Sequence, residues 1–262
     1  ERFTARTGLY DLNSEFDVIP AAGLFLNSSF GIGAEYAQTC FGGPSIFPVS
    51  SLALRIRYED RTGWYAQGAV LDAVPGKAGE PRGTHVSLSA EQGALLAGET
   101  GWREGRAKVA GGGWVYTTDY RRFEEPGYAE YTYGGYLLGQ FSVSDALVAF
   151  VRAGLADPRV RVHAFGAYTG GGLVAYGPFT GNPERELGLG VAAAHTGGPY
   201  RRAERRAGRA VGNAETAIEL TYATPIWRYF RIQGDLQYVL QPSALKERPN
   251  ALALGLRFVA HL

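Results

Sequence analysis

Residues 251–262 read ALALGLRFVAHL, and this stretch decides the fold class. Its large apolar side chains fall at every second position, from Leu252 through Phe258 to Leu262, and the positions between them are mostly small or polar. Successive side chains of a β-strand point to opposite faces, whereas a helix repeats every 3.6 residues. The spacing therefore predicts a strand with one apolar face.

The same alternation recurs along the whole chain. With turn residues as boundaries it predicts about twelve strands, over residues 3–10, 50–59, 63–72, 92–103, 106–119, 130–141, 146–156, 162–176, 186–195, 213–224, 230–241 and 250–262. Most match the ~9–11 residues of a tilted membrane strand. Short connections alternate with long ones, as periplasmic turns alternate with outer loops in outer-membrane barrels. We therefore predict an all-β fold, a transmembrane antiparallel β-barrel in the bacterial outer membrane.

The composition excludes several other classes. Among 262 residues there are 37 Gly, 16 Tyr, 13 Phe and 4 Trp, and 26 basic residues face 25 acidic ones, a balance that argues against a nucleic-acid partner. The single cysteine, Cys40, excludes an internal disulfide framework and a multi-thiolate zinc site. No apolar stretch approaches the ~20 residues of a membrane helix. We predict no metal and no cofactor.

Aromatic residues help to decide which solvent meets the apolar rows. Alternation alone also fits a soluble barrel that binds a ligand inside. Tyr, Trp and Phe gather at membrane interfaces, and several of them lie beside the predicted short turns. These predicted interface residues are Trp64, Trp102, Trp227, Tyr229 and Phe230. They favour the membrane barrel, and extraction into buffer without detergent would instead indicate the soluble one.

Several segments resemble the carbohydrate-selective porins of the OprB type. They are RTGLYDLNSEF (6–16), GPSIFPVSSLALRIRY (43–58), WYAQGAVLD (64–72), ETAIELTY (215–222), QGDLQYVLQP (233–242) and NALALGLR (250–257). The resemblance implies a sixteen-stranded, trimer-forming channel for small neutral sugars such as glucose. Because the family begins with an export signal and further strands, we expect residues 1–262 to be one barrel domain without its first four strands. The ending His261-Leu262 departs from the usual terminal aromatic residue.

Residues 11–49 form the longest predicted loop. The resemblance implies the third outer loop, which in trimeric porins generally folds inward and narrows the pore. A loop of roughly forty residues is normally functional or disordered, and this one is too aromatic for disorder. Its predicted functional residues are Asp11, Glu15, Phe16, Asp17, Phe25, Phe30 and Glu35. An outer cap or a subunit-contact loop remains the alternative.

The polar rows of the strands are the predicted channel lining. Guanidinium groups donate hydrogen bonds and carboxylates accept them, so together they can replace the water around a sugar. The predicted lining residues are Arg6, Arg55, Arg57, Glu59, Arg152, Glu215, Glu219, Arg231, Gln233, Asp235, Gln237 and Arg257. Both signs on one wall argue against strong ion selectivity. For each residue the alternative is a solvated or salt-bridged side chain.

Other partners and functions stay open at this point. The run RRAERRAGR (201–209) can pair with lipopolysaccharide phosphates, contact a neighbouring subunit, or remain solvated. Contact with outer-membrane lipid follows from the barrel itself. A structural or plugged barrel is one alternative function. An outer-membrane enzyme is another, with His85, His163, His195 or His261 as its base, but none of these lies in a nucleophile motif. We predict a porin and not an enzyme.

Overall fold

The computed structural model of the chain describes residues 1–262 apart from 40–41, 77–84, 125, 161–163 and 261–262. Twelve strands form its main sheet, and each corresponds to one of the strands predicted above. They are β1 (Arg2–Tyr10), β2 (Ser51–Glu59), β3 (Trp64–Asp72), β4 (Ala94–Glu104), β5 (Ala107–Tyr116), β8 (Thr132–Ser144), β9 (Leu147–Ala156), β10 (Phe165–Tyr176), β11 (Glu186–Thr196), β12 (Ala214–Trp227), β13 (Phe230–Leu240) and β14 (Ala251–Ala260). The all-β prediction is confirmed.

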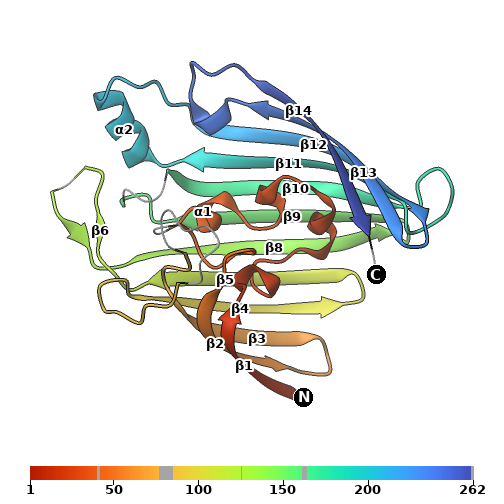
Figure 1. Cartoon of the computed structure of the whole chain (residues 1–262), viewed down its shortest axis with the longest axis horizontal. Coiled ribbons are helices and arrows are strands. Elements are labelled where there is room, and N and C mark those ends of the chain that lie inside the picture. Colours follow the sequence, from red (N-terminus) through yellow and green to blue (C-terminus); the bar gives the residue numbers. More distant parts are fainter. Residues whose placement is uncertain (40–41, 77–84, 125, 161–163, 261–262) are drawn as a thin grey trace.

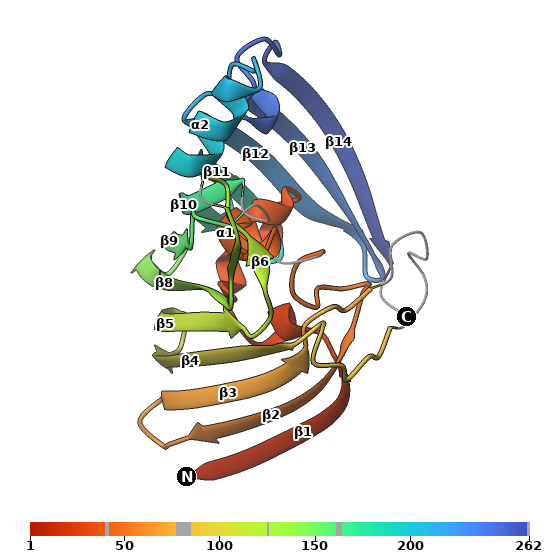
Figure 2. The same ribbon diagram turned by 90° about the vertical axis from the view of Figure 1, so that its left-hand side faces the viewer.

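The strands pair in sequence order, and every pairing is antiparallel. Strands β1 and β14 are the two edges of the described sheet. The sheet is strongly curved, and Figure 2 follows it from β1 at one end of the arc to β14 at the other. This order is that of an up-and-down barrel wall.

The two faces of the sheet differ as the alternation predicts. On the convex side large apolar side chains are exposed, and on β14 these are Leu252, Leu254, Leu256 and Phe258 at 61–78% exposure. Similar exposed residues occur on the other strands, including Leu137, Leu155 and Leu189. A continuous apolar surface of this extent is the lipid-facing band of a membrane barrel.

The segment between β1 and β2 lies inside the curve of the sheet (Figures 1 and 2). It contains three short 3₁₀ helices, η1 (Leu12–Ser14), η2 (Pro20–Leu24) and η3 (Ser28–Phe30), and one helical turn, α1 (Ala34–Ala37). We call residues 11–39 the inward loop. Its apolar side chains pack against the concave face, and Phe16, Phe30 and Tyr36 are almost fully buried.

Two glycines of β11 make room for this loop. A Cβ at Gly188 or Gly190 would come within 2.7–3.0 Å of the rings of Phe25 and Phe30 or of Leu24. Phe25 and Phe30 stack with ring centroids 4.4 Å apart, and Phe25 meets Phe150 of β9 edge-on at 5.5 Å. Part of the glycine excess therefore serves the packing of the loop on the wall.

The connections have different lengths at the two ends of the sheet. The turns β2–β3, β4–β5, β8–β9 and β12–β13 are short, whereas the β10–β11 connection at the same end has nine residues, 177–185. The other long connections lie at the opposite end. These contain the hairpin β6 (Tyr120–Arg121) with β7 (Tyr128–Ala129), the helix α2 (Gly198–Arg206) and η4 (Pro242–Ala244). Neither the hairpin nor the helices were predicted. No helix in the described part of the chain is long and apolar enough to cross a membrane.

Candidate functional site

A buried ion pair fixes the middle of the inward loop to the wall. Nε of Arg152 on β9 lies 2.9 Å from Oδ1 of Asp17, and both side chains are at most 2% exposed. The same guanidinium donates to the carbonyl oxygens of Asp17 (2.6 Å), Phe30 (2.9 Å) and Gly31 (3.1 Å). One arginine thus joins two turns of the loop to the wall, in a site closed to bulk water.

Other wall side chains hold residues 21–27, the part of the loop that lies nearest to β12 and β13. Glu219 on β12 accepts the backbone N–H groups of Leu26 (2.5 Å) and Asn27 (2.9 Å). Gln233 on the neighbouring strand β13 donates to the carbonyl oxygen of Leu24 at 2.7 Å. Ala21 also donates its N–H to Oε1 of Gln140 on β8 at 2.7 Å. The loop is therefore hydrogen-bonded to strands on both sides of the concave face.

A polar cavity of about 510 Å³ lies between the first part of the loop and the concave face of β1–β5. Its lining carries seven basic side chains and two acidic ones among the described residues. These lining residues are Arg2, Thr4, Arg6, Ser14, Glu15, Val18, Pro20, Arg55, Arg57, Glu59, Tyr65, Arg103, Gly105, Arg106, Ala107, Lys108 and Gln140. The space has the volume of a small-molecule site.

Glu15 is the loop carboxylate at the centre of this lining. It accepts from Nε and Nη2 of Arg55 at 2.6 and 2.8 Å and from the hydroxyl of Tyr10 at 2.6 Å. Nη1 of Arg6 lies 3.3 Å away on the other side. Arg55 is buried, but the Arg6 side chain is 63% exposed, so Arg6 presents free donor positions to the cavity.

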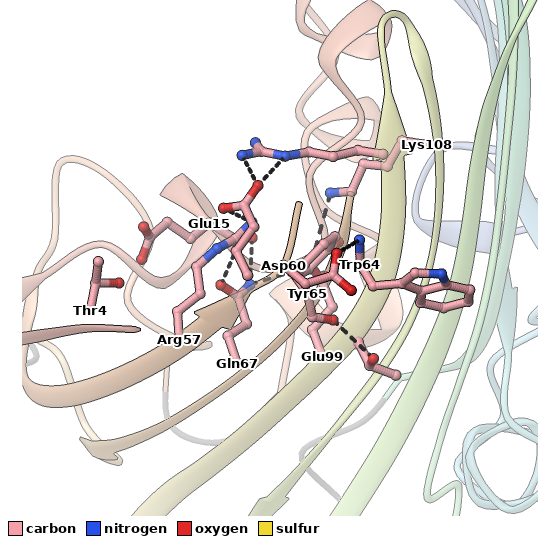
Figure 3. Close-up of polar contacts among 12 residues, drawn as sticks. Thr4, Glu15, Arg57, Asp60, Trp64, Tyr65, Gln67, Glu99 and Lys108 are labelled. Carbon is pink, nitrogen blue, oxygen red and sulfur yellow. Dashed lines mark hydrogen bonds and ion pairs between the residues drawn. The ribbon is translucent and has the colours of Figure 1, made fainter. Parts of the chain in front are cut away.

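A second polar group continues along β2–β5, as Figure 3 shows. Arg57 donates to Oε1 of Gln67 at 2.8 Å and stacks 4.2 Å above the ring of Tyr65. Gln67 in turn donates to the carbonyl oxygen of Glu15 at 2.9 Å. Lys108 donates to the carbonyl oxygen of Val18 at 2.7 Å. The side chains of the wall therefore bind backbone carbonyl oxygens of the loop as well as its charged side chains.

The surroundings of the loop carboxyls shift their pKa values in different directions. Burial alone would raise the pKa of Glu15, but the bonds from Tyr10 and Arg55 lower it overall, so it is an anion at neutral pH. Burial raises the pKa of Asp17 to about 6 against the pull of Arg152. Burial, reinforced by Asp17, raises the pKa of Glu35 to about 8. Among the residues that the structure describes, none is hydrogen-bonded to either oxygen of the Glu35 carboxyl.

Comparison with known proteins assigns the family. The model of the carbohydrate-selective porin, OprB family, matches residues 1–262. This chain belongs to the OprB family. Porin B of Pseudomonas aeruginosa is 25% identical over an alignment of 253 residues that covers 80% of this chain and 55% of that protein. The chain thus spans about half the length of the curated relative that it matches.

Two solved structures of Pseudomonas putida OprB have a similar fold. The high-pH structure gives a TM-score of 0.83 at 19% identity, over 98% of this chain and 69% of that one. The low-pH structure gives 0.58 at 18% identity, over 98% of this chain and 62% of that one. The resemblance noted from sequence is confirmed, and with it the placement of this OprB-family chain in the outer membrane.

The predicted lining residues fall into groups in the folded OprB-family chain. Four of them, Arg6, Arg55, Arg57 and Glu59, share the cavity with Glu15, which was predicted as a residue of the loop. Arg152, Glu219 and Gln233 are buried beneath the loop. Asp235 lies beside them and accepts a hydrogen bond from Nε2 of Gln237 at 2.8 Å. Oε1 of Gln237 in turn accepts from the side-chain amide of Asn27 in the loop at 3.2 Å.

The remaining predicted residues lie away from the cavity. Arg231 pairs with Glu186 near the short-turn end of the sheet, Glu215 accepts the N–H of Ser243 near the opposite end, and Arg257 is exposed on the edge strand. Asp11 caps η1 by accepting the N–H of Asn13 at 3.0 Å.

The predicted interface aromatics are at the short-turn end of the sheet. Trp64, Trp227, Tyr229 and Phe230 are 41–64% exposed, and Trp102 donates to the carbonyl oxygen of Thr62 at 2.9 Å. Their role at a membrane boundary stays a prediction.

The histidines considered as bases are separated in the fold. His195 contacts Thr169 at 2.9 Å on the convex face, and His85 contacts Gln92 at 3.0 Å in an outer connection. His163 and His261 lie outside the described residues. The family assignment indicates a channel rather than an enzyme.

Sequence reasoning missed several cavity and anchor residues. Glu99 on β4 accepts the hydroxyls of Tyr65 (2.8 Å) and Tyr136 (2.7 Å) and the N–H of Asp17 (2.8 Å). Lys108 and Gln67 were also missed. The same period of two would have found all three, because each faces the concave side of its strand.

Proposed function

We propose that this chain forms the wall and the constriction of a passive outer-membrane channel for small neutral sugars such as glucose. The observation that carries the proposal is the position of Glu15 between Arg6 and Arg55, beside a cavity of about 510 Å³. Sugar hydroxyls both donate and accept hydrogen bonds, so a permeation path must offer both kinds of partner in place of water. Here exposed guanidinium donors lie next to carboxylate acceptors.

The pairing of these charges suits a neutral solute. Glu15 forms ion pairs with both Arg6 and Arg55, and Glu59 forms ion pairs with both Arg57 and Arg103. Donors paired with a carboxylate in this way bind a hydroxyl without requiring that the solute carry charge. The inward loop supports the constriction role, because its anchors on both sides of the concave face hold it across the lumen.

The basic excess favours a second candidate, a path for anionic sugars such as sugar acids. Arg2, Arg106 and Lys108 line the cavity, and within the described part of the chain only Lys108 has a carboxylate within ion-pair distance, Glu99 at 3.9 Å. Uncompensated cations attract anions into a narrow space.

Liposome swelling with the purified protein separates the candidates. Glucose, gluconate and a cationic amino sugar are compared at equal osmolarity, together with a disaccharide. A neutral-sugar channel predicts the fastest swelling with glucose. Faster entry of gluconate would replace this proposal with the anionic one, and no permeation by any solute would favour a structural or plugged barrel.

The oligomeric state is a further part of the proposal. The resemblance to trimeric porins implies a homotrimer, and the mass of the protein–detergent complex after subtraction of bound detergent tests it. A monomeric mass would remove the trimer while leaving the channel proposal intact.

A further inference from the structure

The convex surface carries an apolar groove in the half of the sheet nearest the long connections. Its volume is about 670 Å³, and it runs along β8, β9 and β10. Small residues, Gly135, Ala153 and Ala167, form its floor. Leu137 and Leu155, which are 70% and 67% exposed, form its walls. A straight apolar chain could lie in such a groove and bury surface on several sides.

The groove ends at a cluster of charged side chains. Asp157 and Pro158 line its end, and Asp157 holds the guanidinium of Arg159 through two bonds of 2.8 Å. Half of the Arg159 side chain is nevertheless exposed. Next to it, Arg122, Glu124, Arg159 and Pro199 line a smaller cavity of about 70 Å³.

Helix α2 adds further basic side chains to this end. Arg202 donates two bonds of 2.6 Å to Glu124 and thereby ties the helix to the hairpin connection. Arg206 lies 3.7 Å from the same carboxylate with its side chain 67% exposed, and Arg205 is exposed beside it. The end of the groove is therefore flanked by oriented guanidinium groups.

We propose that this groove binds lipid A, with an acyl chain along Gly135 and Ala153 and a phosphate at Arg159 and the α2 arginines. Long connections mark the extracellular end of an outer-membrane barrel, so the groove faces the outer leaflet. Guanidinium groups bind phosphate in a bidentate manner, and lipid A combines phosphates with several saturated chains. Tyr131 and Tyr133, with rings 6.1 Å apart, lie where the headgroup region meets the chains.

Two substitutions test the two parts of the site. Ala153→Leu fills the floor of the groove, and Ala149→Leu is its control, on the same face of the same strand but nearer the short turns. Arg159→Gln removes the cation, and Arg228→Gln is its control, in the β12–β13 turn at the opposite end of the sheet. Circular dichroism and heat-dependent gel migration establish that each variant is folded.

Native mass spectrometry of the protein in detergent measures the bound fraction of bisphosphorylated lipid A. Ala153→Leu and Arg159→Gln should each weaken binding about tenfold, the loss expected for one charge-assisted bond or one displaced chain, and the controls should stay within about twofold. With lipid A stripped of its phosphates, only Ala153→Leu should have an effect.

Three results would overturn the proposal. In the first, the wild type binds lipid A no better than Ala153→Leu does. In the second, phosphatidylglycerol binds equally well with the same dependence on both variants, which would indicate a general anionic-lipid surface. In the third, Ala153→Leu changes the oligomeric mass and not lipid binding, which would make the groove an interface between copies of the chain. None of these results depends on whether the channel conducts sugars.

Discussion

Replacing Arg152 by Met removes the cation that holds the inward loop and keeps most of the side-chain volume. The change leaves Asp17 as a buried carboxyl without its partner and takes four hydrogen bonds from loop carbonyl oxygens, those of Asp17, Ser29, Phe30 and Gly31. Removal of one member of a buried ion pair costs about 3–5 kcal/mol. Because the loss falls on the loop–wall contact, we expect it to shift the loop from docked toward undocked by a factor of about 10²–10⁴.

Swelling of liposomes with a disaccharide reports this shift. Arg152→Met should admit disaccharides faster than the wild type does, and a protease added to the outside should cleave the loop sooner. The double variant Asp17→Asn, Arg152→Met removes both charges and should recover part of the exclusion. Arg231→Met, which breaks an ion pair on the wall without touching the loop, is the control. Unchanged disaccharide exclusion and unchanged protease resistance in Arg152→Met would refute the reasoning.

Three further predictions concern the same loop. The folded-state pKa of Glu35, about 8, lies above its ordinary 4.5, so the stability linked to its protonation is complete below pH 4.5 and is lost as the pH rises to 8. The melting temperature of Glu35→Gln should therefore change less between pH 5 and 9 than that of the wild type, and the same change in both proteins would contradict this. Gly190→Leu should destabilise the loop by about 1–3 kcal/mol through overpacking against two phenylalanine rings, whereas Gly234→Leu, with open space at its Cβ, should not; equal melting temperatures would count against the packing account. Glu219→Leu leaves two loop N–H groups unpaired, and hydrogen exchange at residues 26 and 27 should then rise about tenfold or more; unchanged exchange would show that the contact does not hold the loop.

The strands were predictable because their signal is local. In β14 the leucines alternate within ten residues, and the same pattern locates β2 and β13 within two residues of their observed limits. Helix α2 was missed, because four of its nine residues are arginines and its few apolar side chains, Pro199, Tyr200 and Ala203, are not fully buried, so the apolar pattern is weak.

The path of the inward loop was predicted in outline only. Aromatic content indicated an ordered loop, but which wall residues it meets depends on pairs far apart in sequence, such as Asp17 with Arg152. Polar rows in a strand look alike whether they face open lumen or a docked loop. For this reason Arg6 and Glu219 appeared equivalent in the sequence, while one is exposed at the cavity and the other is buried against Leu26.

The most direct test of the channel account is the ion current through single channels in a planar bilayer. If sugars pass through the cavity beside Glu15, glucose should reduce the current of the wild-type protein in a concentration-dependent manner. Arg57→Ala should weaken this block several-fold, about 1 kcal/mol for one lost charge-assisted contact, while Arg257→Ala on the edge strand should leave it unchanged. A current that glucose leaves unaltered, or a block that is insensitive to Arg57→Ala, would contradict the account.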